Sequence, residues 1–105
     1  MTAHALFITH RTAPGQRDAV RAVWEKYMTP AVQGNADHLA YYYCFDAEDA
    51  DVLRVFQLYS NEAAAAAFLQ HPNYTAYLGE VEGLLAGPPQ VHAAIPQWQK
   101  GLSVY

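Results

Sequence analysis

The stretch His38–Ser60, which reads HLAYYYCFDAEDADVLRVFQLYS, decides the fold of this chain. Residues 39–45 and 52–59 are rich in aromatic and β-branched side chains, which favour β-strands because they pack well on a pleated surface. The segment between them, Asp46–Asp51, carries four carboxylates and no apolar residue larger than alanine. We therefore predict a β-hairpin closed by a solvated acidic loop, and the rest of the chain must cover or extend it.

Length and composition define the class of protein. A chain of 105 residues is long enough for one domain with a sizeable core, which we predict over residues 4–95. An apolar tail follows over residues 97–105 and is expected to pack. It contains Trp98, Leu102, Val104 and Tyr105. The net charge of −4 argues against a nucleic-acid partner. Charged residues make up 15% of the chain against the usual share of roughly 25%, so we expect part of the surface to be covered by a partner.

The sequence also indicates where the protein works. Cys44 is the only cysteine, which excludes an intrachain disulfide. The residues after Met1 are interrupted by His4, His10 and Arg11, unlike a signal peptide, and no apolar run approaches the ~20 residues of a membrane span. We therefore expect a cytoplasmic protein that does not associate with membranes.

Periodicity places the other elements. Residues 4–12 and 91–95 are predicted strands, and residues 16–33 are a predicted helix that Pro30 should kink or end near Met28. A second helix is expected to start at Ser60 or Asn61, and a third to cover residues 72–85. The order β-α-β-β-α-α-β is typical of an α+β fold, a ferredoxin-like four-stranded antiparallel sheet with helices on one face.

Both faces of the predicted hairpin are apolar. On its first strand, Leu39, Tyr41, Tyr43 and Phe45 alternate with Ala40, Tyr42 and Cys44. Helices cover only one face of such a sheet, so the other face needs a second sheet. We therefore predict a homodimer that packs through the sheet face.

The sequence contains few motifs that are typical of catalytic or ligand-binding sites. The five histidines form no HxxxH or HExxH pair, and GxGxxG, GxxxxGK[ST] and GxSxG are absent, so no metal or nucleotide site is expected. What remains is an aromatic pocket between the helices and the sheet, whose candidate lining is Leu6, Ile8, His10, Val55, Gln57, Tyr59, Phe68, His71, Tyr74 and Tyr77. The alternative is that these residues are simply core. Gln57 stands out because a buried amide needs a tyrosine hydroxyl or a ligand as partner, and His10 and His71 are the candidate bases.

Four features, in this order along the chain, resemble the antibiotic biosynthesis monooxygenase (ABM) domain family, small dimeric α/β-barrel proteins that include quinol monooxygenases. They are HRTAPG at 10–15, the tyrosine-rich strand with its acidic turn, QLYSNE at 57–62 and FLQHPNYTAY at 68–77. The resemblance spans about residues 4–95. Phe68 and Asn73 stand where many relatives carry histidine. The places that bind haem in haem-degrading members hold Ile8, Tyr59 and Leu78, so no haem is expected.

The resemblance implies cofactor-independent oxygenation of a phenol or hydroquinone. His10 or His71 would be the catalytic base, and Gln57, Tyr59, Phe68, Tyr74 and Tyr77 would hold the substrate. The competing hypothesis is a non-catalytic dimeric barrel that binds a small hydrophobic molecule, because a fold hosts many functions.

Overall fold

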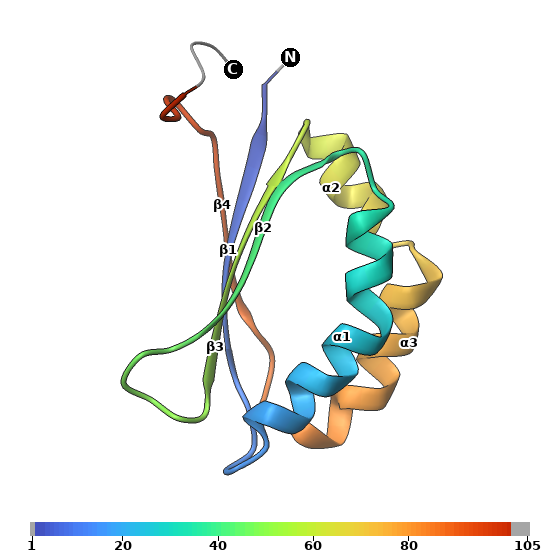
Figure 1. Cartoon of the computed structure of the whole chain (residues 1–105), viewed down its shortest axis with the longest axis vertical. Coiled ribbons are helices and arrows are strands. Elements are labelled where there is room, and N and C mark those ends of the chain that lie inside the picture. The colour runs from blue at the N-terminus through green and yellow to red at the C-terminus, as the bar shows by residue number, and fades with distance from the viewer. Residues whose placement is uncertain (1, 102–105) are drawn as a thin grey trace.

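A computed structural model describes residues 2–101 and contains one four-stranded antiparallel sheet with helices on one side (Figure 1). The strands lie in the order β2-β3-β1-β4. This arrangement confirms the predicted ferredoxin-like α+β fold. The elements, in chain order, are β1 (His4–Arg11), α1 (Arg17–Gln33), β2 (His38–Phe45), β3 (Val52–Tyr59), α2 (Glu62–Phe68), α3 (Pro72–Val81), the 3₁₀ turn η1 (Glu82–Leu84) and β4 (Gln90–Ala94).

The β2–β3 hairpin has one irregularity that matters for the site. Tyr41 pairs with Gln57 in regular register, but His38 pairs with Tyr59 while Ala40 pairs with Leu58, so Leu39 is the extra residue of a β-bulge. Strict alternation had placed Leu39 on the same face as Tyr41. That placement is wrong, because the bulge leaves Leu39 53% exposed and turns His38 toward the helices instead.

Helix α1 continues past Pro30 to Gln33, which confirms the helix predicted over residues 16–33. Of the two effects expected of Pro30, an end of the helix near Met28 is wrong. Proline removes one backbone donor and costs a helix interior about 3 kcal/mol. Met28 and Ala31, on either side of Pro30, are buried in a cluster with Tyr59. We attribute the continuation of the helix to this burial, which offsets the cost of the proline.

The two later helices begin at side-chain caps. Asn61 accepts a hydrogen bond from the backbone N–H of Ala64 at 2.8 Å and so caps α2, as predicted. His71 precedes Pro72, and its Nδ1 accepts from the backbone N–H of Asn73 at 3.0 Å. Helix α3 is shorter than predicted, because the chain tightens into η1 after Val81.

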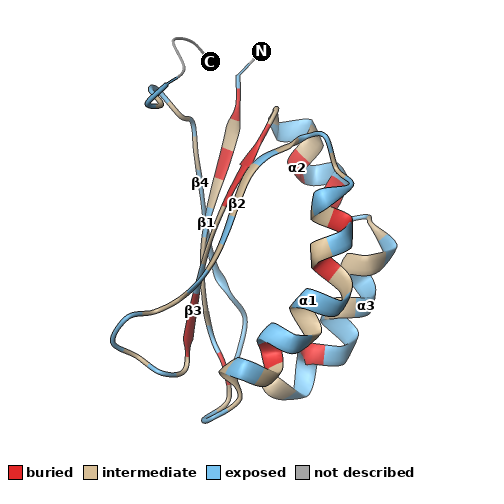
Figure 2. Ribbon diagram, viewed as in Figure 1, coloured by how far each residue is buried: buried red, intermediate tan, exposed pale blue. Residues whose placement is uncertain are grey.

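Buried residues lie in the strands of the sheet and in the helices (Figure 2). A small cluster of Ala3, Ala5 and Leu58 packs with Phe56 on the helix-free side. On the helix side, one cluster surrounds Tyr59 and Phe68, and another joins Leu53 to Val20 and Val81. The helices contact the sheet mainly at β2 and β3. On the helix side, Leu6 and Ile8 of β1 and Val55 in the middle of β3 are only half-buried. The helix side of the sheet is therefore incompletely covered at its centre.

Of the four apolar tail residues that were expected to pack, the structure describes one, Trp98, and this residue does not pack. Trp98 is 76% exposed, while Leu102, Val104 and Tyr105 lie outside the described residues. No helix within residues 2–101 is long and apolar enough to cross a lipid bilayer.

Candidate functional site

The amide of Gln57 lies at the centre of a polar network on the helix side of the sheet. Gln57 is 7% exposed, in the middle of β3. Its Oε1 accepts a hydrogen bond from the hydroxyl of Tyr59 and lies 3.2 Å from Nε2 of His38. Of the two partners that the sequence allowed for this amide, the structure supplies the tyrosine hydroxyl and adds a histidine.

His38 is the member of this network that sequence reasoning missed. Its ring lies 4.3 Å from that of Tyr59 and edge-on to Phe68 at 4.5 Å, between centroids. Burial lowers the pKa of His38, although the hydrogen bond to Gln57 and the nearby charge of Asp37 act in the opposite direction. A lowered pKa favours the neutral form of the imidazole at neutral pH. Its position depends on the bulge at Leu39, which no pattern in the sequence reveals.

Tyrosine side chains from the sheet and from α3 lie near this network on the helix side of the sheet. Tyr41 accepts a hydrogen bond from Nε1 of Trp24 at 3.0 Å, and burial raises the pKa of Tyr41 to about 12. Burial also raises the pKa of Tyr43, Tyr59, Tyr74 and Tyr77. The hydroxyl of Tyr43 is buried and has no partner among residues 2–101. At neutral pH these hydroxyl groups are therefore uncharged.

The two predicted catalytic histidines lie in separate pockets. His10, at the end of β1, lines a pocket of about 510 Å³ with residues of α3 and of the loop before β4, and its Nε2 donates to the carbonyl oxygen of Gly87 at 2.8 Å. His71 lines a pocket of about 380 Å³ between the end of α1 and α2. Phe68 shares the pocket of His71 and also contacts His38, so this pocket adjoins the Gln57 network.

The remaining predicted substrate-binding residues also lie on the helix side. Tyr74 and Tyr77 stack at 6.5 Å between ring centroids, and both pack against the cluster that contains Tyr59 and Phe68. The structure thus brings Gln57, Tyr59, Phe68, Tyr74 and Tyr77 to one side of the sheet.

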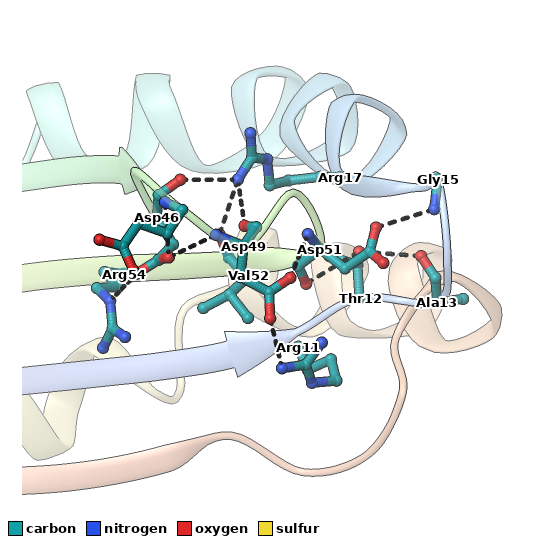
Figure 3. A network of polar contacts seen from close by, with 11 residues as sticks. Arg11, Thr12, Ala13, Gly15, Arg17, Asp46, Asp49, Asp51, Val52 and Arg54 are labelled. Atoms are coloured by element: carbon teal, nitrogen blue, oxygen red, sulfur yellow. Dashed lines mark hydrogen bonds and ion pairs between the residues drawn. The ribbon is translucent and has the colours of Figure 1, made fainter.

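The acidic hairpin loop is held by arginines instead of being only a solvated turn (Figure 3). Nη1 of Arg17 donates to the carbonyl oxygens of Asp46, Asp49 and Val52 at 3.2, 2.9 and 3.2 Å. Asp46 also pairs with Arg54, which lowers the pKa of Asp46 to about 2. Within residues 2–101, no group of three or more histidine, cysteine or acidic side chains is placed to hold a metal ion.

Comparison with known proteins identifies the family. The sequence profile of the antibiotic biosynthesis monooxygenase family matches residues 4–80. The chain belongs to this family. None of the curated proteins is similar enough in sequence to match.

Several solved structures share the fold of this family member. A proposed antibiotic biosynthesis monooxygenase from Chloroflexus aurantiacus has a TM-score of 0.81 and 22% identity, covering 97% of this chain and 100% of that one. A proposed family member from Caulobacter crescentus has a TM-score of 0.86 and 14% identity, with 92% of each chain covered. Rv0793 from Mycobacterium tuberculosis has a TM-score of 0.81 and 23% identity, covering 95% of this chain and 100% of that one. At these identities the likeness concerns the fold alone.

Proposed function

We propose that this chain is a cofactor-independent monooxygenase whose substrate is a small electron-rich aromatic molecule of the phenol or hydroquinone type. The observation that carries the proposal is the cluster of uncharged, hydrogen-bonding side chains around Gln57 on the helix side of the sheet. Membership of the monooxygenase family supports the reaction class. Such a substrate supplies its own electrons: a hydroquinone and O₂ give a hydroxyquinone and water, with one oxygen atom incorporated and the other reduced.

The substrate would lie along β1 and β3, over the half-buried Ile8 and Val55. In the strand pairing, Leu6 lies opposite Gln57 and Ile8 opposite Val55, and His10 follows on the same side of β1. Leu6 and His10 are four residues apart, which corresponds to about 13 Å along a strand. An aromatic substrate in this place would reach toward Gln57 at one end and toward His10 at the other.

Of the two predicted bases, the hydrogen bonds favour His10. Nε2 of His10 donates to a carbonyl oxygen, so Nδ1 of the neutral ring keeps its lone pair and can accept a proton. In His71, Nδ1 already accepts from a backbone N–H, and its lone pair is occupied. We therefore propose His10 as the base that deprotonates the substrate, with His71 lining the neighbouring pocket.

An oxygen electrode tests this function directly. Enzyme and a panel of hydroquinones, including 1,4-dihydroxynaphthalene, are mixed without oxygen and then exposed to air. We expect oxygen uptake in a one-to-one ratio with substrate, and a loss of at least about a hundredfold in His10→Ala, the usual range for a general base. His92→Ala, which changes an exposed histidine on β4, is the matched control.

Two other results would change the proposal. Unchanged uptake in both His10→Ala and His71→Ala would remove the assignment of the base. No uptake with any hydroquinone would favour the alternative, a non-catalytic dimeric barrel that binds a small hydrophobic molecule in the same place.

We also propose that the protein is a cytoplasmic homodimer formed through the helix-free face of the sheet. Phe7 and Tyr42 on this face are 50% and 63% exposed. Their rings lie 5.1 and 6.2 Å, between centroids, from that of Phe56. A continuous exposed aromatic patch of this kind is typical of an interface.

A further inference from the structure

We infer that Asn35 and His38 position the side-chain amide of Gln57 so that its NH₂ group donates a hydrogen bond to an oxygen atom of the bound substrate. This inference rests on the proposed function, because it takes the substrate to be an oxygen-bearing aromatic molecule. It makes His38 a positioning residue and not a base. The site would then recognise an acceptor oxygen on an aromatic ring.

The orientation of the Asn35 amide is set by its own turn. Its Oδ1 accepts from the backbone N–H of Asp37 at 3.1 Å, so the other end, Nδ2, faces His38. The distance from Nδ2 of Asn35 to Nδ1 of His38 is 3.0 Å. An amide nitrogen only donates, so Nδ1 must be the acceptor and the neutral imidazole carries its hydrogen on Nε2.

This tautomer fixes Gln57 in turn. The Nε2–H of His38 points to Oε1 of Gln57 at 3.2 Å, and the hydroxyl of Tyr59 donates to the same oxygen. Both lone pairs of Oε1 are then occupied. A flipped amide would place its NH₂ group against the N–H of His38, so the two donors hold the amide in one orientation.

The NH₂ group of Gln57 is the part of this amide that a ligand could contact. Within residues 2–101 it donates to no protein acceptor, and Gln57 is only 7% exposed. Among these residues, the buried side-chain atoms without a partner are Thr29 Oγ1, Tyr43 Oη and Gln99 Oε1, so Nε2 of Gln57 is not one of them and is open to solvent or to a ligand. The side chains that flank Gln57 in the sheet are Leu6 and Tyr41, one apolar and one neutral at physiological pH. An oxygen atom of a phenol or quinone would meet this unpaired donor in an uncharged setting.

NMR of the protein with ¹⁵N-labelled histidine tests the first two steps without any substrate. We expect His38 to be the Nε2–H tautomer at pH 7. Asn35→Asp keeps an oxygen for the N–H of Asp37 but replaces the donor that faces Nδ1 with an acceptor. The pKa of His38 should then rise by about 1 or more.

Few other groups act on this titration. The Asp37 carboxylate is the nearby charge, Tyr41 and Tyr59 are neutral phenols, and α2 contributes the apolar ring of Phe68. An Nδ1–H tautomer in the unmodified protein, or an unchanged pKa in Asn35→Asp, would overturn the inference.

Binding of phenol and toluene tests the last step, because the two probes differ in the hydroxyl group. His38→Phe keeps an aromatic ring between Tyr59 and Phe68 but removes both hydrogen bonds of the imidazole, and Gln57→Leu removes the donor itself. We expect each variant to bind phenol about tenfold more weakly and toluene within about twofold of the unmodified protein. If His38→Phe does not fold, Asn35→Ala supplies the comparison, with a smaller loss that is again confined to phenol.

These results separate the inference from the proposed function. Equal losses for the two probes, no loss for phenol, or no phenol binding by the unmodified protein would overturn the donor role of Gln57. If the tautomer and the selective loss of phenol are found but no hydroquinone consumes oxygen, only the proposed oxygenation fails.

Discussion

The imidazole of His38 has a pH dependence that stability measurements can detect. Burial lowers its pKa in the folded protein from the ordinary 6.5, whereas the unfolded chain takes up a proton near that ordinary value. The free energy of unfolding is therefore highest above pH 6.5 and falls as the pH drops below it, until the lower pKa of the folded state is reached. Urea unfolding between pH 5 and 8 should show this decrease.

His38→Phe isolates this contribution, because the variant has no proton to bind at position 38. The difference in unfolding free energy between the two proteins should change with pH between 5 and 6.5 and stay constant above 7. Asp46 and Asp49 have pKa values below their ordinary 3.8, so they titrate outside this window. A difference that does not vary with pH would contradict a lowered pKa for the half-buried imidazole of His38.

Single residues also show which parts of the site can be predicted from the sequence. Gln57 was predictable as a site residue, because an amide in the middle of a strand needs partners, and the structure supplies one of the two that were expected. His38 was not predictable as a site residue, because one extra residue at Leu39 reverses the alternation of side chains upstream of Ala40. A bulge is a property of the pairing between two strands, and the sequence of either strand alone does not encode it.

At the scale of elements, Arg17 connects the start of α1 to the β2–β3 loop. Its guanidinium donates to three backbone carbonyl oxygens and lies 3.9 Å from the centroid of the Phe45 ring. We expect Arg17→Ala to lower the free energy of unfolding by about 2 kcal/mol, since carbonyl acceptors at the loop lose a charged donor. Urea unfolding at constant pH measures the change.

Arg21→Ala is the control on the same helix. Arg21 is exposed and forms an i,i+4 pair with Glu25, so its removal should cost no more than a few tenths of a kcal/mol. Equal effects of the two substitutions would show that the loop does not depend on Arg17. The pairing of Arg17 with this loop was not predictable, since it joins residues about thirty positions apart whose only sequence signal is opposite charge.

For the whole molecule, the order of elements predicted the sheet and the side on which the helices lie. It did not predict that His10 and His71 would open into different pockets. Helices of this fold can rest on different parts of a sheet, and here they favour β2 and β3, leaving β1 less covered. The position of the helices on the sheet depends on side-chain packing between elements, such as that of Met28 and Ala31 against Tyr59. It does not depend on the periodicity within one element.

The helix-free face supplies the last prediction, which concerns the assembly. Phe7, Tyr42 and Phe56 form an aromatic patch on this face, and in a two-fold dimer each residue of the patch would be buried twice.

Sedimentation equilibrium at micromolar concentration should give the mass of a dimer. Tyr42→Asp would bury two carboxylates in that interface and should raise the dissociation constant at least about a hundredfold, which corresponds to about 2.7 kcal/mol. Leu69→Asp adds the same charge at an exposed apolar residue just after α2 and should leave the mass unchanged. Because Tyr42 is mostly exposed in the single chain, Tyr42→Asp should alter the far-UV circular dichroism little, so a loss of mass would report on association and not on folding. A monomer in the unmodified protein would remove the proposed dimer and leave the patch without a known partner.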